Sequence, residues 1–594
     1  MSEPTRGTRS LRRGRGFLVV GAAVAAITAG GPVALATDTF RFHGSGYGHG
    51  IGMSQWGAYG LASQGWTYRE ILTHFYRGTQ VERVPLPRSL RVGLTSGRAT
   101  IHLGARSGPV ELWLDAPGRK HVARIPGGDT WTVTRSRTRS AYAIRNEAGR
   151  LVGGRRWGGP ASPLFATYAD AGSRVFVPEA DDLWHNGFTY AYGFLEFDLI
   201  GCASTCALRL TNQLPLERYL RGLGEMPSSW PAGALSAQAV AARTFATSRI
   251  RRGGLRSSCD CHMGDGASDQ VYVGWSKEIG PDGDRWVAAV DGTAGEVVTY
   301  GGTVIQAFYA ASDGGHSENV EDVWHGGNSA FAIPYLRGVC DPGEYTSANP
   351  WTDWTRSFTA ATVTMRLRPY TGSIGGIRRF TDVRRGDSGR IISAIARGSN
   401  GSASVSGTEL RSALGLPDGR VWINEDRNIV GAIRAKYDGL MCRPGLPTSG
   451  IATFDHGSRQ LFATGGIYRN AAADLTVWLK GSIHGEYLGV GGPRGRLGLP
   501  VSSAVEASGL SGPETCRSCR RLVLEHGRIY FKDGAGAHAL WGPVLSAYLA
   551  NGGAQGALGY PTTRVRVDAD GARRARFEHG TIVCSDGACD VRAA

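Results

Sequence analysis

The chain has 594 residues, which is more than one hydrophobic core supports, so several domains are expected. Hydrophobic residues make up 41% of the chain and charged residues 20%, which excludes an intrinsically disordered protein. The formal net charge of +16 comes almost entirely from arginine and predicts an anionic partner.

Residues 1–36 are predicted to be a secretory signal peptide. An arginine-rich start precedes an apolar run from Phe17 to about Val33, and Ala34-Leu35-Ala36 offers an A-x-A cleavage site. A retained membrane anchor is the alternative, because the run is near the lower length limit for a span. Its Gly and Ala content and its small-residue end favour cleavage. The adjacent arginines Arg12-Arg13 are also consistent with twin-arginine export.

Secretion changes the interpretation of charge and cysteine content. The signal peptide carries +4 of the net charge, which leaves +12 on the mature chain. Outside the cell a nucleic-acid partner is not expected, and an anionic wall polymer is a better candidate. A genomic preference for arginine codons would also explain the charge. Ten cysteines fit an oxidising compartment.

The cysteines fall into four local pairs, with two left over. Short-range disulfides are the simplest interpretation, and only one pair has the CxxC spacing that a zinc ribbon uses. Spacing alone does not fix the pairing. The local pairs are Cys202/Cys206, Cys259/Cys261, Cys516/Cys519 and Cys584/Cys589, and the remaining two cysteines are Cys340 and Cys442.

The pattern along the mature chain predicts an α+β fold. Residues 37–80 begin with a glycine-rich loop and continue into helices, with a capping box at Thr67–Glu70. From residue 81 to 211 short alternating runs separated by turn residues predict a β-rich region. An alanine-rich helix is expected over residues 232–250, and strands and loops return before a mixed segment ends near residue 440.

Residues 441–594 contain an internal repeat. The stretch from Lys480 to Pro500 matches the stretch from Trp541 to Pro561 at a constant offset of 61 residues. The pieces FDHG at Phe454, LEHG at Leu524 and FEHG at Phe577 also recur. Self-similarity of this kind predicts a small array whose units bury one another's faces.

A single acid, Glu225, precedes the alanine-rich helix on a turn. It lies before Met226-Pro227, so its backbone is expected to be extended. Burial in a cleft would raise its pKa and let it donate a proton near neutral pH. The structural alternative is an ion pair with a nearby arginine, Arg221 or Arg243.

The segment LPLERYLRGLGEMPSSWPAGALSAQAVAARTFA around this acid resembles the core motif of the stage II sporulation protein D family. The stretches DQVYVG at Asp269, GEVVTYGGTVIQAFYAASDGGHSENVEDVW at Gly295 and PYLRGV at Pro334 match in the same order. The resemblance covers at least residues 214–339, within core motifs at 211–340 of a domain expected over 81–440. A segment that commonly closes this domain, GSGYGHGIGMSQWGAYG from Gly44, comes first here, and we expect it to dock from the other terminus.

The resemblance implies a β-rich peptidoglycan lytic transglycosylase that cuts glycan strands, preferentially those stripped of stem peptides. Carried over, the family's catalytic acid falls on Glu225. It would protonate the glycosidic oxygen and then deprotonate the muramyl 6-hydroxyl, which closes a 1,6-anhydro ring. Hydrolysis would require a second carboxylate, and no cofactor is required. Some relatives are instead non-catalytic proteins that enhance an amidase, and pure carbohydrate adhesion is a third interpretation.

The same resemblance suggests other site residues, each of which could instead stabilise the fold. Zinc is a second implication, because one branch of the family binds it through Cys and His from this region. Cys259, Cys261 and His262 would be the ligands here, and a disulfide, for example to Cys340, is the alternative. The substrate-binding candidates are Gln238, Arg243, Gln270, Tyr272, Ser312, His316 and Glu318.

The C-terminal units resemble LGFP repeats through GRLGLP at Gly495 and GALGYP at Gly556. Such repeats occur in wall-associated proteins of actinobacteria and are thought to tether them to the envelope. The resemblance therefore predicts a secreted, cell-wall-associated protein. The family name refers to sporulation, but growth, division and wall remodelling fit equally well.

Overall fold

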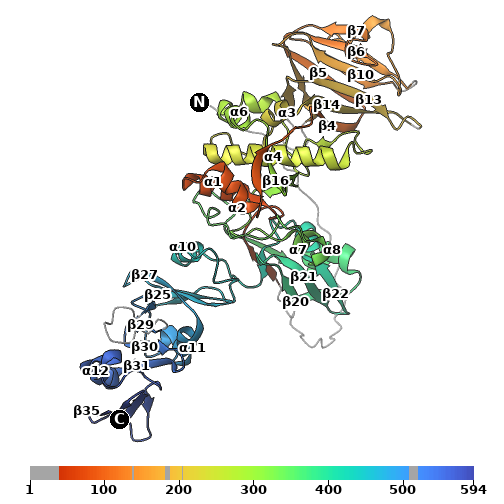
Figure 1. Ribbon diagram of the computed structural model, residues 1–594. Helices are drawn as coiled ribbons and strands as arrows, with labels where there is room; N and C mark the ends of the chain where they lie inside the picture. The colour runs from red at the N-terminus through yellow and green to blue at the C-terminus, as the bar shows by residue number, and fades with distance from the viewer. Residues whose placement is uncertain (1–38, 137–139, 181–186, 204, 507–518, 594) are drawn as a thin grey trace, which may run out of the picture. The chain divides into compact units, whose positions relative to one another are not determined.

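We describe the computed structural model over residues 39–136, 140–180, 187–203, 205–506 and 519–593. The predicted signal peptide and Cys516 lie outside these residues. The fold is α+β, as predicted (Figure 1). None of the helices in the described ranges has the length and hydrophobicity that a membrane crossing needs.

Two sheets form the β-rich part, and their inward-facing side chains share one hydrophobic core. Alternation of buried and exposed residues along strands such as β4 and β6 produces this arrangement. The larger sheet has the order β15 (Met263–Gly264), β4 (Ser89–Arg98), β14 (Ala207–Pro215), β13 (Phe194–Ile200), β10 (Leu164–Tyr168), β6 (Val110–Leu114), β7 (Lys120–Ile125). The smaller has the order β12 (Phe188–Tyr190), β11 (Arg174–Val177), β5 (Thr100–Ser107), β8 (Thr130–Arg135), β9 (Tyr142–Arg145).

The alanine-rich helix α4 (Ala232–Gly253) is the centre of the adjoining helical layer. Its small side chains let other helices pack closely, and α1 (Gln55–Ser63), α2 (Tyr68–Phe75) and α6 (Gly283–Gly292) contact it. The N-cap is Pro231, which makes no side-chain capping hydrogen bond. The helix also runs three residues past Ile250, and the capping box at Thr67 and Glu70 is present.

The N-terminal segment joins sheets whose other strands come later in the chain. β1 (Thr39–Gly44) lies between β19 (Trp354–Thr359) and β23 (Val421–Ile423). β2 (Met53–Ser54) pairs in parallel with β18 (Tyr309–Ala310), and β3 (Gln80–Arg83) pairs with β16 (Glu296–Tyr300), which also pairs with β17 (Thr303–Val304). Figure 1 shows α1 and α2 directly beside α4. The segment therefore reaches the helical layer that carries Glu225.

A separate, smaller core is formed by β1 together with elements from residues 354–423. Phe40 and Phe42 of β1 pack there with Trp354, Leu367 and Ile391. A capping box at Ser406 and Glu409 starts one of its helices. Its elements are α8 (Ala360–Thr371), β20 (Ile377–Arg385), β21 (Ile391–Gly398), β22 (Ser402–Ser406) and α9 (Gly407–Leu414).

The described residues 431–506 and 519–593 form three units, each a short helix followed by a four-stranded antiparallel sheet. The first helix packs with the first sheet through Ile433, Tyr437, Phe462 and Ile467, although the predicted boundary at residue 441 falls after it. The first unit is α10 (Gly431–Gly439) with β24 (Ala452–Phe454), β25 (Gly457–Phe462), β26 (Gly465–Asn470) and β27 (Leu475–Leu479). The second is α11 (Gly481–Gly489) with β28 (Val505–Glu506), β29 (Arg520–Leu524), β30 (Gly527–Lys532) and β31 (Gly536–Trp541). The third is α12 (Gly542–Ala550) with β32 (Arg566–Val567), β33 (Arg573–Phe577), β34 (Gly580–Ser585) and β35 (Ala588–Ala593).

Equivalent bridges show how the three units correspond. Pro447 pairs with Phe462, Pro500 with Leu524, and Pro561 with Phe577. The counterpart of LEHG and FEHG in the first unit is therefore the turn that begins at Phe462. The match proposed for FDHG at Phe454 was wrong, because that tetrapeptide is one hairpin earlier in its sheet.

Candidate active site

Glu225 lies on the turn between α3 (Leu216–Arg221) and α4 and lines a groove of about 520 Å³. The turn runs antiparallel to residues 271–273: Gly224 N–H donates to the Val271 carbonyl at 2.8 Å, and Val273 N–H donates to the Gly222 carbonyl at 2.8 Å. The carboxyl is partly buried. Apolar residues, the Lys277 side chain and Asp282 also line the groove.

Hydrogen bonds from neutral donors hold this carboxyl in place. The Val271 N–H donates to Oε1 at 2.7 Å and the Tyr309 hydroxyl donates to Oε1 at 3.0 Å. The Gln55 side chain, from the first turn of α1, lies near the carboxyl and acts to lower its pKa. Because Oε1 already accepts two donors, a proton on this acid belongs on Oε2.

The surroundings raise the pKa of Glu225. Burial is the largest cause, since it penalises the charged form. The hydrogen bonds and the Lys277 charge act in the opposite direction and only partly offset burial. Glu225 forms no ion pair within the described residues, because Arg221 pairs with Asp291 at 2.6 Å and Arg243 pairs with Glu217 at 2.9 Å.

Lys277, on α5 (Trp275–Glu278), is the cation of this groove. Its Nζ donates to the Met226 carbonyl at 2.5 Å. Burial lowers the pKa of Lys277 to about 8, although the Glu225 charge acts to raise it. A lysine with this pKa is still mostly charged at neutral pH, so it can attract an anionic or hydroxyl-rich ligand into the groove.

Gln270 orients the Tyr309 side chain, which in turn bonds to Glu225. Its Nε2 donates to the Tyr309 oxygen at 2.9 Å, and its Oε1 accepts from the Tyr219 hydroxyl at 3.0 Å. Since the Tyr309 oxygen accepts from Gln270, the Tyr309 proton is directed to Glu225. The Gln270 side chain is fully buried. It therefore orients the acid through Tyr309 and is not placed to contact a glycan.

The remaining substrate-binding candidates on and near α4 are also buried. Gln238 accepts a hydrogen bond from Gln55 Nε2 at 3.4 Å, and the Tyr272 ring packs at a tilt against Tyr219 with ring centroids 5.0 Å apart. Arg243 has a 0% exposed side chain and donates to the Val290 and Glu296 carbonyls. In this conformation these three residues stabilise the fold around the site and do not line the groove.

Ser312, His316 and Glu318 lie in the loop after β18 and do not line the groove either. Ser312 donates to Glu344, and the His316 ring bonds to the Ser317 carbonyl at 2.7 Å. Glu318 accepts from the Ser388 hydroxyl at 2.6 Å. Burial raises the pKa of Glu318 to about 7 and lowers the pKa of His316 to about 4.

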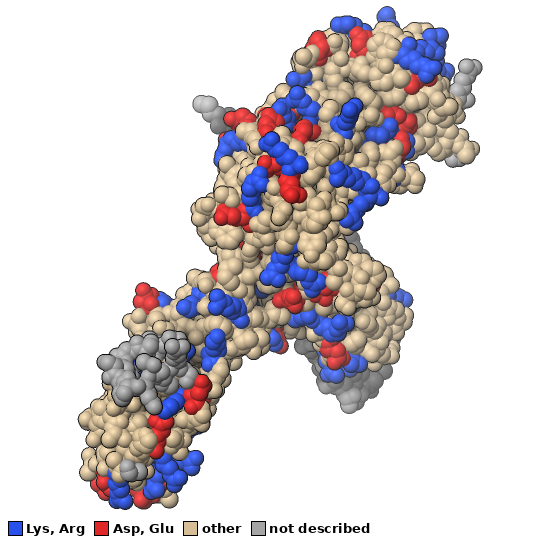
Figure 2. All heavy atoms as spheres, in the orientation of Figure 1, with Lys and Arg blue, Asp and Glu red and all other residues tan. Residues whose placement is uncertain are grey.

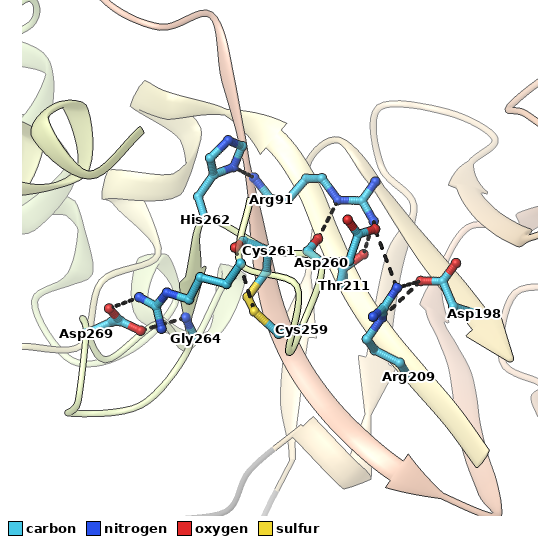
Figure 3. Close-up of a disulfide and its surroundings, with 11 residues drawn as sticks. Arg91, Asp198, Arg209, Thr211, Cys259, Asp260, Cys261, His262, Gly264 and Asp269 are labelled. Carbon is cyan, nitrogen blue, oxygen red and sulfur yellow. Dashed lines mark hydrogen bonds and ion pairs between the residues drawn. A yellow bond between two sulfur atoms is a disulfide. The ribbon is translucent and has the colours of Figure 1, made fainter. Parts of the chain in front are cut away.

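The proposed zinc ligands are occupied by other interactions. Cys259 is bonded to Cys261, and Figure 3 shows this disulfide beside the arginines of the larger sheet. His262 Nδ1 accepts the Arg91 N–H at 2.9 Å. The nearby acid Asp260 pairs with Arg91 at 2.8 Å. A zinc site would first require reduction of the disulfide, so zinc binding stays a prediction.

The disulfides follow the local pairing expected from spacing. Cys202 joins Cys206 and Cys584 joins Cys589, and the two remaining cysteines, Cys340 and Cys442, join each other. The alternative bond from Cys259 to Cys340 is therefore wrong. The Cys340–Cys442 bond crosses the predicted domain boundary at residue 441, which ties the first repeat unit to the preceding region.

Comparisons with known proteins find two family models that match parts of the chain. Residues 205–300, which include Glu225, match the model of the stage II sporulation protein family, and residues 497–556 match the LGFP repeat. This part of the chain is therefore similar to the stage II sporulation protein family. The resemblances inferred from the sequence are thus confirmed for both parts of the chain.

Individual relatives match parts of the chain in sequence. An uncharacterized protein of Brachyspira hyodysenteriae is 35% identical over 175 residues, 28% of this chain and 42% of that protein. Stage II sporulation protein D of Bacillus subtilis is 29% identical over 225 residues, 35% of this chain and 61% of that protein. The amidase enhancer of Bacillus subtilis is 34% identical over 131 residues, 22% of this chain and 15% of that protein. The chain thus spans less than two thirds of each relative.

Replacing Glu225 should change how stability depends on pH. Because the folded-state pKa of Glu225 is raised, its contribution favours folding at low pH and is lost as the pH rises through that pKa. We therefore expect the melting temperature of Glu225→Gln, relative to the wild type, to rise between about pH 4 and about pH 7.

Glu70→Gln serves as the control with the opposite sign. Hydrogen bonds from Thr67 lower the pKa of Glu70, so this variant should lose stability relative to the wild type as the pH rises through the acidic range to about pH 5, and the difference should stay constant above it. A Glu225→Gln difference that stays constant or falls with rising pH would contradict the raised pKa.

Proposed function

We propose that this protein is a secreted lytic transglycosylase that cleaves peptidoglycan glycan strands, with Glu225 as its acid and base. The environment of the Glu225 carboxyl is the observation that supports this proposal best. It lines an open groove, it forms no ion pair within the described residues, and its pKa is raised. These are the properties of a proton donor that works near neutral pH.

One carboxyl is sufficient for this reaction because the substrate supplies the nucleophile. Glu225 donates its proton to the glycosidic oxygen between N-acetylmuramic acid and N-acetylglucosamine as the bond from C1 to that oxygen breaks. The resulting carboxylate then accepts the proton of the muramyl C6 hydroxyl, whose oxygen forms the new bond to C1. The acid is regenerated, and water is not consumed.

Hydrolysis is the competing chemistry, and the groove contains one residue that could support it. Asp282 is exposed and is the second carboxylate among the described residues that line this groove. A hydrolase needs a second carboxylate either as a nucleophile or to activate water. The transglycosylase account requires no chemical role for Asp282.

The activity test uses purified protein and glycan strands without stem peptides. Glu225→Gln should lower the release of 1,6-anhydro-muramyl products by about 10²–10⁴-fold, because the amide cannot transfer a proton. Asp282→Asn should retain most of the activity. The matched control Asp291→Asn removes an acid that pairs with Arg221 and is outside the groove lining. Wild-type-like activity in Glu225→Gln would refute the proposal.

A non-catalytic role is the second candidate, favoured by the match to an amidase enhancer. In that case the groove would not cleave strands, and the protein would act through an amidase partner. A wild-type protein that releases no products but accelerates an amidase on intact walls would establish this role. Glu225→Gln should then stimulate the amidase as well as the wild type does.

The repeats support a location at the cell wall, with the glycan or an anionic wall polymer as their ligand. They match the LGFP repeat. On the face drawn in Figure 2, basic and acidic side chains are interspersed, so this face offers no uniform basic strip for a polyanion. We therefore favour neutral glycan contacts over simple charge attraction for this part of the chain.

Salt dependence separates the two ligands of the repeats. The full-length protein should sediment with purified walls at low salt and still do so at about 1 M salt, where charge attraction is screened within about 3 Å. Walls stripped of anionic polymers should bind it equally well. Release by salt, or loss of binding to stripped walls, would show that an anionic polymer is the ligand.

A further inference from the structure

We propose that Asp313, Asp341 and Glu344 form a buried site for one calcium ion. The three carboxyl groups are 1%, 0% and 0% exposed. Their ligand atoms lie within 4.8 Å of one another. Oxygens that bind one Ca²⁺ ion, each about 2.3–2.6 Å from it, also lie within about 5 Å of one another. The site is separate from the groove that Glu225 lines.

Two oxygens of this cluster have no partner in the described part of the chain. The Gly315 N–H donates to Asp313 Oδ1 at 2.8 Å, and the Gly343 N–H donates to Asp341 Oδ1 at 2.9 Å. The other oxygen of each aspartate, Oδ2, is buried without a hydrogen bond. A buried carboxylate oxygen without a partner is costly, and a cation between the two would satisfy both.

Glu344 is held in a different way. Its Oε2 accepts from the Ser54 hydroxyl at 2.7 Å, and its Oε1 accepts from Asn349 Nδ2 at 2.9 Å and from the Gly314 N–H at 3.2 Å. Ser54 is the N-cap of α1, and its hydroxyl also accepts the Gly57 N–H at 3.0 Å. The carboxyl is therefore fixed in orientation beside the two aspartates.

The nearby arginines do not balance all the negative charge of the three carboxylates, and a divalent cation would supply the missing positive charge. Three buried arginines face this region. Arg390 is paired with Asp418 at 2.8 Å, and Arg434 is paired with Asp438 at 2.8 Å. Arg420 donates to the Gly314 and Ser388 carbonyls and to Ser45, and it forms no ion pair within the described ranges. Three carboxylates thus face one guanidinium that has no carboxylate partner.

The chemistry of the donors favours calcium among divalent ions. All the donors are oxygens, which hard cations prefer, and neither a thiol nor an imidazole is among them. The cluster is fully enclosed, so the bound ion must give up most of its water. Magnesium dehydrates reluctantly, whereas calcium accepts irregular sets of protein oxygens.

The second acidic cluster of the chain shows the contrast. Glu196, Asp198 and Asp260 also lie within 4.8 Å of one another. Arg91 and Arg209 pair with all three, at 2.8 to 3.4 Å (Figure 3 shows the arginines with Asp198 and Asp260). Arginine already neutralises that cluster, so it has no need of a metal.

The ion would stabilise the segments that surround Glu225, the acid of the proposed reaction. The ion's ligand Glu344 bonds to Ser54, and the next residue, Gln55, lies near Glu225 and acts on the pKa of that acid. Ser54 also belongs to β2, which pairs with the strand that carries Tyr309. The ion would therefore hold together the N-terminal segment, the loop after β18 and the loop after Cys340.

The test measures metal content and stability, so its outcome does not depend on whether the protein is an enzyme. The full-length protein, purified without chelator, should contain about one calcium per chain by elemental mass spectrometry. Treatment with EGTA should remove the ion and lower the melting temperature. Added CaCl₂ should restore the melting temperature, and equal MgCl₂ should restore little of it.

Variants assign the effect to the cluster. Asp341→Asn and Asp313→Asn should lose the bound calcium and the response to EGTA, whereas the control Asp260→Asn should keep both. If the two variants fail to fold, the metal content and EGTA response of the wild type still decide the matter. A wild-type protein that holds no calcium and melts at the same temperature with CaCl₂ or EGTA overturns the proposal. Shared protons would then neutralise the cluster.

Discussion

The candidate site depends on one constraint. The Glu225 carboxyl is held by hydrogen bonds from neutral groups, and no positively charged side chain in the described residues is bonded to it. Glu225 accepts hydrogen bonds from a backbone amide and a tyrosine hydroxyl, while burial raises its pKa. An arginine in contact would have lowered that pKa and kept the acid ionised. Arg221 and Arg243, the two arginines considered as partners of Glu225, pair instead with Asp291 and Glu217. The fold thus keeps this acid able to donate a proton.

The groups that hold Glu225 come from segments far apart in the chain. Gln55 is at the start of α1, Val271 is in the loop after β15, and Tyr309 is in β18. The parallel pairing of β2 with β18 brings the first and last of these together. The loop that carries Val271 is anchored by an ion pair between Arg256 and Asp269 and by the disulfide that precedes it. Precise placement of the acid therefore requires the whole domain to be folded.

Much of the local structure could be predicted from the sequence. The turn before α4, the alanine-rich helix, the capping box at Thr67 and the repeat array all have short-range signals. The partners of the acid have none. Tyr309 reaches Glu225, and Lys277 reaches the groove beside it, only through tertiary packing, and Gln55 comes from the other end of the domain. Motif proximity suggested Gln238 and Arg243 as ligand contacts, but a helix face so rich in alanine is buried.

The most direct test of the central claim is the fate of water oxygen in the reaction. If Glu225 acts alone and the muramyl 6-hydroxyl is the nucleophile, cleavage of denuded strands in H₂¹⁸O gives 1,6-anhydro products that contain no ¹⁸O by mass spectrometry. Products with ¹⁸O at the new reducing end would show that water attacks C1. A second carboxylate would then be required, and the single-acid account would be contradicted.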